Sequence, residues 1–182
     1  MRYTKDGIIA EHNRRGLKYL LFWGHTSKGG AVGKECLSQW YDCGFEADGR
    51  KYHTAEQYMM AQKALLFGDN EIFDRIMKAG SPDEFKKLGQ QVRGFDEEKW
   101  KAERCNIVIR GNYAKFSQNA ELKAFLLSTG SKILVEASPY DRIWGIGMSA
   151  DDSRSENPNL WRGMDLLGFC LMEVRDMLAA EE

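Results

Sequence analysis

The sequence predicts an α+β fold: a mainly helical single domain with a small β-sheet. Two apolar runs far apart in the chain, LKYLLFW (17–23) and KILVEA (132–137), are typical of short buried strands. Between and after them, residues suited to helix starts precede amphipathic segments, so helices should form the majority. The order of strands, helices, one strand and a last helix differs from the regular βαβ alternation of doubly wound nucleotide-binding folds.

The first strand is expected to lead into a loop and a hairpin. The glycine-rich stretch GHTSKGGAVGK (24–34) lacks the G-x-x-x-x-G-K-[ST] order of a phosphate-binding loop. A flexible surface connection is therefore the favoured interpretation, and a phosphate-cradling loop is the alternative. Asp48-Gly49, flanked by Phe45 and Tyr52, predicts a hairpin turn.

Start and stop signals predict the helices. Thr54 with Gln57 three residues later reads as a capping box, and Ser81-Pro82 is a second strong start. The predicted helices cover about 54–68, a segment from 81, then about 97–115, 120–128 and 160–179. The last helix is predicted to place Met164, Leu167, Gly168, Leu171 and Leu178 on its core face.

Composition restricts the possible functions. A net charge of −1 over 182 residues lacks the basic surface that tight, non-specific nucleic-acid binding needs. No apolar run is long enough to span a membrane, and the N-terminus has no signal-peptide core, so we expect no membrane partner and a cytoplasmic location. The four scattered cysteines and three separated histidines indicate reduced thiols and no structural metal. We also expect no other cofactor. No pattern defines an oligomeric state.

The helix start TAEQYMMAQKA (54–64) carries the first candidate carboxylate. With Thr54 as N-cap, Glu56 takes the second helical position, where the helix dipole stabilises its anion. An anionic carboxylate can activate water, act as a nucleophile or face a cationic transition state. The commoner interpretation, from the residues alone, is an acid that only complements the dipole. Lys63 lies two turns later, and two roles stay open for it: a salt bridge or a phosphate contact.

The segment ASPYDRIWGIG (137–147) follows the second apolar run and is a good place to present side chains. Asp141 is the natural second carboxylate, and its alternative is a turn-forming aspartate. Gly145 and Gly147 permit close backbone approach or a positive φ. Trp144 is either part of the core or a ligand contact.

Aromatic and polar side chains supply further candidates. Tryptophans are mostly buried, yet Trp23 and Trp144 each precede a glycine and also suit stacking on a flat ring. His25 either orients a ligand or faces solvent. The polar stretch 149–159 is interpreted as a disordered connection, with a lid over the site as the alternative.

Six segments in chain order resemble the NADAR family of YbiA-like N-glycosidases. They are LSQWY (37–41), DGRKYHTAEQYMMAQKA (48–64), KKLGQQVRGFDEEKW (86–100), ERCNIVIRGNYAKFSQN (103–119), LLSTGSKILVEASPYDRIWGIG (126–147) and LWRGMDLLGFCLMEVR (160–175). The resemblance covers roughly residues 20–178, the core of one domain expected over 1–182. It departs from the family at Gln39, where many members have asparagine, and at Asp42-Cys43, where a proline-containing segment is usual.

The resemblance implies an α+β fold and hydrolysis of a bond between ribose C1 and nitrogen. It places the family's functional glutamate, tryptophan and aspartate on Glu56, Trp100 and Asp141. Under this hypothesis Glu56 stabilises an oxocarbenium-like centre, Asp141 binds ribose hydroxyls or positions water, and Trp100 walls the pocket. The residues expected to contact substrate are Trp23, Gly24, His25, Ser38, Trp40, Lys63, Arg104, Trp144 and Gly145.

Two substrate classes follow from the resemblance. One is ADP-ribose attached to guanine in DNA or nucleotide, and the other is the ribosylamino-pyrimidine phosphates of early riboflavin synthesis. The FWGH and LSQWY segments favour the first, so an ADP-ribose-containing substrate, ADP-ribosylated DNA included, is the expected partner. A module that binds ADP-ribose or NAD without cleavage is the third hypothesis, and the pair Glu56 and Asp141 argues against it.

Overall fold

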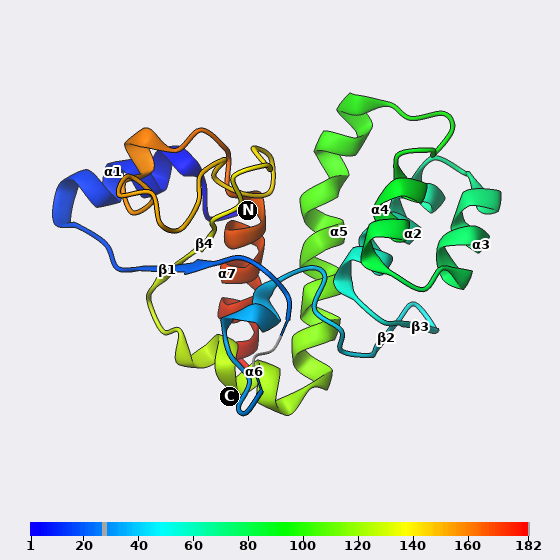
Figure 1. The fold of residues 1–182 in the computed structure, drawn as a ribbon, viewed down its shortest axis with the longest axis horizontal. Helices are drawn as coiled ribbons and strands as arrows, with labels where there is room; N and C mark the ends of the chain where they lie inside the picture. Colours follow the sequence, from blue (N-terminus) through cyan, green and yellow to red (C-terminus); the bar gives the residue numbers. More distant parts are fainter. Residues whose placement is uncertain (27–28, 182) are drawn as a thin grey trace. The chain divides into compact units, whose positions relative to one another are not determined.

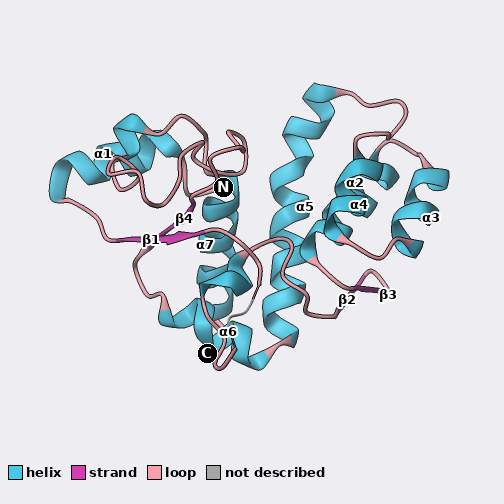
Figure 2. Cartoon of the chain, in the orientation of Figure 1, coloured by secondary structure: helices cyan, strands magenta, loops and turns pink. Residues whose placement is uncertain are grey.

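The computed structural model describes residues 1–26 and 29–181. Its chain forms two compact units, each described by itself: the sheet unit, made of Met1–Ser38 and the chain from Ala120 onward, and the helical unit, Gln39–Asn119. The described elements of the sheet unit are α1 (Lys5–Arg15), β1 (Tyr19–Phe22), the 3-10 helix η1 (Lys34–Leu37), α6 (Ala120–Ser128), β4 (Ile133–Glu136), η2 (Pro158–Leu160) and α7 (Leu166–Ala179). Those of the helical unit are β2 (Phe45–Ala47), β3 (Arg50–Tyr52), α2 (Ala55–Leu66), α3 (Asn70–Lys78), α4 (Pro82–Gly89) and α5 (Glu97–Gln118) (Figure 1). Helices predominate beside two short sheets, which confirms the predicted mainly helical α+β class (Figure 2).

A parallel pair of strands forms the centre of the sheet unit. β1 and β4 pair from Tyr19 with Ile133 to Phe22 with Glu136, so the two apolar runs of the sequence lie side by side. Helix α7 packs on β4 and is buried along most of its length. Gly168 makes this packing possible, because a Cβ atom there would lie 2.1 Å from the carbonyl oxygen of Leu134. The carboxyl end of β4 is thereby held against the start of α7.

Helix α2 is the centre of the helical unit and packs against α3, α4 and α5. Its first seven residues are all buried, as expected for a helix covered on several sides. Two glycines on neighbouring helices allow close approach: a Cβ atom at Gly111 would lie 2.4 Å from the Tyr58 ring, and one at Gly89 would lie 2.0 Å from the sulfur of Met60. α2 is therefore fixed closely against both α4 and α5.

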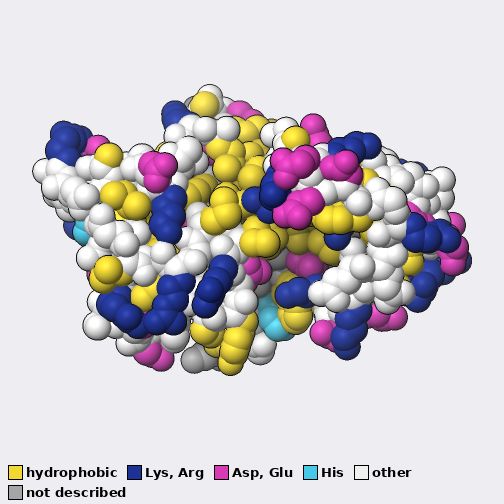
Figure 3. Space-filling view, turned by 90° about the horizontal axis from the view of Figure 1, so that it is seen from above, with side chains coloured by type: hydrophobic (Ala, Val, Ile, Leu, Met, Phe, Trp, Pro, Cys, Tyr) yellow, Lys and Arg dark blue, Asp and Glu magenta, His cyan; other side chains and the backbone are white. Residues whose placement is uncertain are grey.

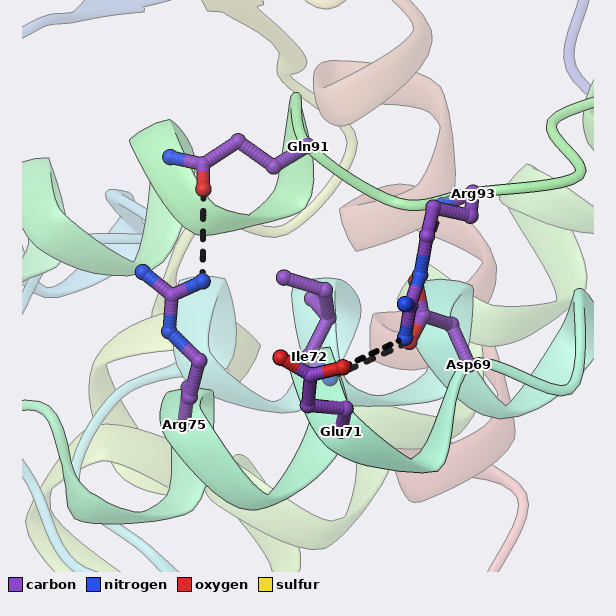
Figure 4. Close-up of polar contacts among 6 residues, drawn as sticks. All are labelled: Asp69, Glu71, Ile72, Arg75, Gln91 and Arg93. Carbon is purple, nitrogen blue, oxygen red and sulfur yellow. Dashed lines mark hydrogen bonds and ion pairs between the residues drawn. The ribbon is translucent and has the colours of Figure 1, made fainter.

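A carboxylate clamp joins the start of α3 to the segment before α5 (Figure 4). Asp69 caps α3, its Oδ1 accepting from the backbone N–H of Ile72 at 3.2 Å. Arg93 donates to both oxygens of Asp69, through Nη2 at 2.6 Å and Nε at 2.9 Å, and also pairs with Glu71. These hydrogen bonds from the Arg93 side chain and backbone hold the pKa of Asp69 well below its usual range. The clamp fixes a loop that carries no regular structure.

Local sequence signals predicted several elements correctly. The hairpin at Asp48-Gly49 is present, with Phe45 opposite Tyr52. Thr54 caps α2, accepting from the backbone N–H of Gln57 at 3.1 Å. The capping box is shifted by one residue, because the Gln57 side chain accepts from the N–H of His53 and not from that of Thr54. Of the predicted loop 24–34, residues 27–28 lie outside the described part, and the other residues up to Gly33 form no helix or strand.

Three expectations were wrong or incomplete. Helices α1 and α3 were not predicted, although Thr4 and Asp69 cap them. The last helix begins at Leu166 and not near Leu160, because Asp165 has a left-handed backbone with φ 55°. Met164 accordingly precedes the helix and is exposed, whereas the other four residues predicted on the core face are buried.

The polar stretch 149–159 is an ordered connection and not the disordered one that was expected. It forms consecutive turns, with Asp152 N–H donating to Ser149 and Ser155 N–H to Asp152. The indole N–H of Trp161 donates to the carbonyl of Ser155 at 2.6 Å and anchors the segment to the core.

The surface carries charges of both signs. On the face drawn in Figure 3, Lys and Arg side chains alternate with Asp and Glu side chains and with uncharged regions. Within the described residues, no helix has the length and apolar character needed to cross a membrane.

Candidate active site

Glu56 lies where the sequence places it, at the second position of α2. The Oγ1 of Thr54 accepts from the backbone N–H of Gln57 at 3.1 Å and caps the helix. Only 5% of Glu56 is exposed, and its backbone N–H donates to the carbonyl of Gln39 at 2.9 Å. A buried carboxylate at the positive end of a helix can stabilise a nearby cation.

Lys63 and Trp100 share the surroundings of Glu56. The Lys63 ammonium donates to the carbonyl of Gly89 at 2.8 Å and lies 4.6 Å from the ring centre of Phe95 and 5.6 Å from that of Trp100. Burial lowers the pKa of Lys63, and the negative charge of Glu56 opposes that shift. The Lys63 ammonium is thus held by a carbonyl and two aromatic rings, and it interacts electrostatically with Glu56.

Arg104 lies one turn after Trp100 on α5 and is 9% exposed. Its Nε is buried and has no hydrogen-bond partner among the described residues. A guanidinium left in this state is suited to an anionic ligand such as a phosphate.

A pair of buried amides joins α5 to the segment before β2. Asn112 is fully buried and its Nδ2 donates to Oε1 of Gln39 at 2.7 Å. Gln39 is 7% exposed and also accepts the backbone N–H of Glu56 through its carbonyl. Among the residues expected to contact substrate, Trp40 follows Gln39 and is half-buried. In the helical unit, the structure therefore gathers Glu56, Lys63 and Trp100, and it adds an amide pair that sequence reasoning did not single out.

In the sheet unit, Asp141 organises the turn after β4. Its Oδ1 accepts from the backbone N–H groups of Ile143 and Trp144, both at 2.8 Å, so the turn-forming interpretation holds. Within the described residues, no hydrogen bond to Oδ2 is present. Gly145 is required in the turn, because a Cβ atom there would lie 2.7 Å from the carbonyl oxygen of Glu136. Asp141 can therefore hold the turn through one oxygen and offer the other to a ligand.

Aromatic rings lie exposed beside this turn. Trp23 is 57% exposed, and its ring centre lies 6.4 Å from that of Tyr140, the residue before Asp141. Gly24 has φ 83°, a conformation that side chains rarely adopt, and His25 after it is exposed. Tyr140 was not predicted as a site residue, although its neighbour Asp141 was.

A buried carboxyl supports the turn from below. Asp165 is fully buried, its Oδ1 accepts the N–H of Glu136 at 2.9 Å, and its own N–H donates to the carbonyl of Gly145 at 3.2 Å. Burial, reinforced by the charge of Glu136, raises the pKa of Asp165 well above its ordinary value, against two backbone hydrogen bonds that lower it. Asp165 thus connects the strand end, the turn and the start of α7, and its surroundings favour the neutral form of its carboxyl group.

The sheet unit contains one more predicted site residue, Ser38, and a separate cavity. Ser38 follows η1 and donates its backbone N–H to the carbonyl of Glu35 at 3.1 Å. In the described part of the chain, no three His, Cys, Asp or Glu side chains gather in a way that could hold a metal ion. A cavity of about 510 Å³ in the sheet unit, lined by residues of α1 and by Arg175, contains none of the predicted site residues.

Comparison with known proteins gives consistent matches. The NADAR domain family matches residues 21–179. N-glycosidase R617 of Acanthamoeba polyphaga mimivirus is 43% identical over 164 residues, which are 87% of this chain and 95% of that protein. N-glycosidase YbiA of Escherichia coli strain K12 is 31% identical over 137 residues, 75% of this chain and 77% of that one. The NMR structure of the E. coli protein YbiA superimposes with a TM-score of 0.70 at 27% identity, covering 90% of this chain and 86% of the other. The chain belongs to the NADAR family.

Proposed function

We propose that this chain is an N-glycosidase that hydrolyses a bond between ribose C1 and nitrogen, and that its substrate is ADP-ribosylated guanine. The relatives R617 and YbiA are both named N-glycosidases, which supports the reaction class. The observation that carries the proposal is the buried carboxylate of Glu56 at the second position of α2, with its helix already capped by Thr54.

The chemistry of the reaction assigns a role to Glu56. When the C1–N bond breaks, its electron pair leaves with the base and C1 acquires oxocarbenium-like positive charge. The anion of Glu56 stabilises that charge and accepts a proton from the water whose oxygen forms the new bond to C1. The departing base ends with a proton on its nitrogen, so the hydrolysis consumes one water. Trp100 supplies an aromatic wall beside Lys63.

Asp141 has a separate role in the proposal. Its Oδ1 accepts two backbone N–H groups and fixes the turn, and its other oxygen is available to a hydroxyl group of a ligand. Gly145 and Trp144 keep this turn in place through their own backbone contacts, the carbonyl of Trp144 accepting the N–H of Leu167.

Two observations favour ADP-ribose over a smaller ribose phosphate. Trp23 and Tyr140 are exposed rings in the sheet unit, and such rings suit stacking on an adenine. Arg104 has a buried Nε without a partner, which suits a diphosphate oxygen. A ribosylamino-pyrimidine phosphate has the same scissile bond but neither an adenine nor a diphosphate.

Product analysis on both substrate classes tests the proposal. Wild-type protein is incubated with ADP-ribosylated guanosine DNA and, separately, with the ribosylamino-pyrimidine phosphate, and released base and sugar are quantified. Release of ADP-ribose is expected, and the guanine remains in the DNA without its modification. Cleavage of the pyrimidine substrate alone would contradict the substrate assignment, and binding of ADP-ribose without cleavage of either substrate would contradict the reaction.

The variant Glu56→Gln tests the assignment of the carboxylate. We expect its turnover to fall by about 10²–10⁴-fold while its unfolding transition stays close to that of the wild type. Glu98→Gln is a matched control, because Glu98 is also the second residue of a helix, α5, and its side chain is 85% exposed. Turnover in Glu56→Gln equal to that of Glu98→Gln would refute the role of Glu56.

A further inference from the structure

The amide pair Gln39–Asn112 has two polar atoms that make no hydrogen bond within the described residues. Asn112 donates through Nδ2 to Oε1 of Gln39 at 2.7 Å and to the carbonyl of Val108 at 2.9 Å. Nε2 of Gln39 and Oδ1 of Asn112 are buried and have no partner in the part of the chain that the structure describes. Buried polar groups in native proteins are nearly always paired, so this donor and this acceptor indicate a bound molecule.

The orientation of both amides is determined by the backbone. The carbonyl of Val108 can only accept, so the group of Asn112 that faces it must be the NH₂ group. The same NH₂ group then requires an acceptor, Oε1, on Gln39. The atoms left over are consequently one N–H donor from Gln39 and one C=O acceptor from Asn112.

The pair is attached directly to the candidate catalytic carboxylate. The carbonyl of Gln39 accepts the N–H of Glu56 at 2.9 Å. Asn112 follows Gly111, whose missing side chain allows the ring of Tyr58 on α2 to lie against α5. The amide pair is thus fixed relative to the start of α2, one hydrogen bond away from Glu56.

A donor beside an acceptor is complementary to a ring edge that carries a C=O group next to an N–H group, the edge of a lactam. Guanine has this edge, and so does a 4-oxopyrimidine. A phosphate or carboxylate offers acceptors only and would leave Asn112 unpaired. Adenine offers an N–H beside a ring nitrogen, but in ADP-ribose the adenine is separated from the scissile bond by two riboses and a diphosphate. The group next to Glu56 is therefore the base attached to ribose C1.

We propose that Gln39 and Asn112 form the leaving-base subsite and that they recognise the lactam edge of the base. This inference rests on the proposed N-glycosidase function and specifies its leaving group. When the C1–N bond breaks, its electron pair moves into the base and increases the negative charge on the lactam oxygen. The N–H of Gln39 donates to that oxygen, so the hydrogen bond strengthens as the bond breaks.

The first experiment measures discrimination between bases. Hydrolysis of the ADP-ribosylated guanosine adduct is compared with that of its O6-methyl analogue, which has neither the N–H nor a free oxygen. In the same way, hydrolysis of the ribosylamino-4-oxopyrimidine phosphate is compared with that of its 4-methoxy analogue. Wild-type protein is expected to prefer the lactam by about 10- to 100-fold in kcat/KM, in the range for loss of a paired hydrogen-bonding edge. The pair of compounds that shows this preference identifies the source of the base.

The variant Gln39→Met removes the donor and keeps the side-chain volume. It is expected to lower kcat/KM for the lactam substrate and to bring the preference close to one, while the O6-methyl analogue is hydrolysed as before. Gln91→Met is the matched control, because Gln91 is exposed and its amide bonds the carbonyl of Lys87 and the side chain of Arg75, away from the amide pair. A preference that persists in Gln39→Met would overturn the proposal.

The second experiment needs no turnover and does not depend on the folding of Gln39→Met. The Glu56→Gln variant is labelled with ¹⁵N, and the side-chain amide of Gln39 is followed by NMR during titration with ADP-ribosylated guanosine, its O6-methyl analogue and adenosine. A shift of this resonance with the lactam compound alone is expected. No shift, or an equal shift with the O6-methyl analogue or adenosine, would mean that an ordered water or another group satisfies the amides, and would refute the proposal. If wild-type protein hydrolyses neither substrate class, the proposed function fails and the titration still decides the subsite.

Discussion

Replacing Asp165 by asparagine tests whether this buried carboxyl is neutral in the folded protein. Asp165 is fully buried, and its Oδ1 accepts the N–H of Glu136 at 2.9 Å. Burial raises the pKa of Asp165 well above its ordinary value, and the charge of Glu136 adds to the shift. Asparagine has the same shape, keeps an oxygen for the N–H of Glu136 and carries no charge.

The sign of the expected effect follows from proton binding. An aspartate in an unfolded chain has a pKa near about 3.9. Between that value and the raised pKa of Asp165, the folded state holds a proton that the unfolded state has released. The free energy of unfolding of the wild type therefore falls as pH rises through this window, by about 1.4 kcal/mol per pH unit from this one group. Asp165→Asn lacks this contribution, so its stability relative to the wild type should increase with pH at that rate.

Urea unfolding followed by tryptophan fluorescence between pH 4 and pH 7.5 measures the difference. Asp152→Asn is the control in the same unit, because the hydrogen bonds and charge of Arg154 hold the pKa of Asp152 well below its usual range. The proton window of Asp152 lies below the ordinary aspartate pKa, so its variant should keep a constant difference from the wild type over this pH range. Parallel stability curves for the wild type and Asp165→Asn would show that Asp165 is ionised when folded, and would refute the reasoning.

Two further predictions concern the helical unit. Asp69→Asn should destabilise the protein at neutral pH. The stabilising charge of Asp69 is fully present above the pKa of the unfolded chain and is lost as pH falls from there toward the lowered pKa of the folded state, so the difference from the wild type should shrink over that range. Urea unfolding at pH 2 to 7 checks this. Gly111→Ala should cost about 1–3 kcal/mol, because the new Cβ would lie 2.4 Å from the rigid ring of Tyr58. Gly89→Ala should cost less stability than Gly111→Ala, since the Met60 sulfur that the new Cβ meets can rotate away. Equal losses of stability for the two variants in thermal unfolding would contradict this comparison.

The features that sequence patterns located are those whose determinants are local. Thr54 and Ser81 each accept an N–H three residues on, so the cap and the helix start lie within one turn. That cap places Glu56 at the second position of α2. Spacing alone also located the turn at Asp48-Gly49.

The features that were missed depend on distant residues. Asn112 meets Gln39 across 73 residues, and nothing near either one indicates the other. The last helix begins late because Met164 N–H pairs with the carbonyl of Arg142 and holds the preceding chain extended against the turn. A buried asparagine in the apolar stripe of a long helix was the available signal for the amide pair, because such a residue needs a partner.

Glu56 and Asp165 show why the position of a carboxyl at a helix start does not by itself define its role. Both are buried and both lie at the first residues of a helix, yet their surroundings differ. Glu56 has its helix capped by Thr54 and faces the positive charge of Lys63. Asp165 has the carboxylate of Glu136 as its neighbour, and burial and that charge both raise its pKa. The charge of Lys63 thus stabilises an anion at Glu56, as the proposed role beside a cationic ribosyl centre requires, whereas Asp165 is suited to support the Asp141 turn in its neutral form.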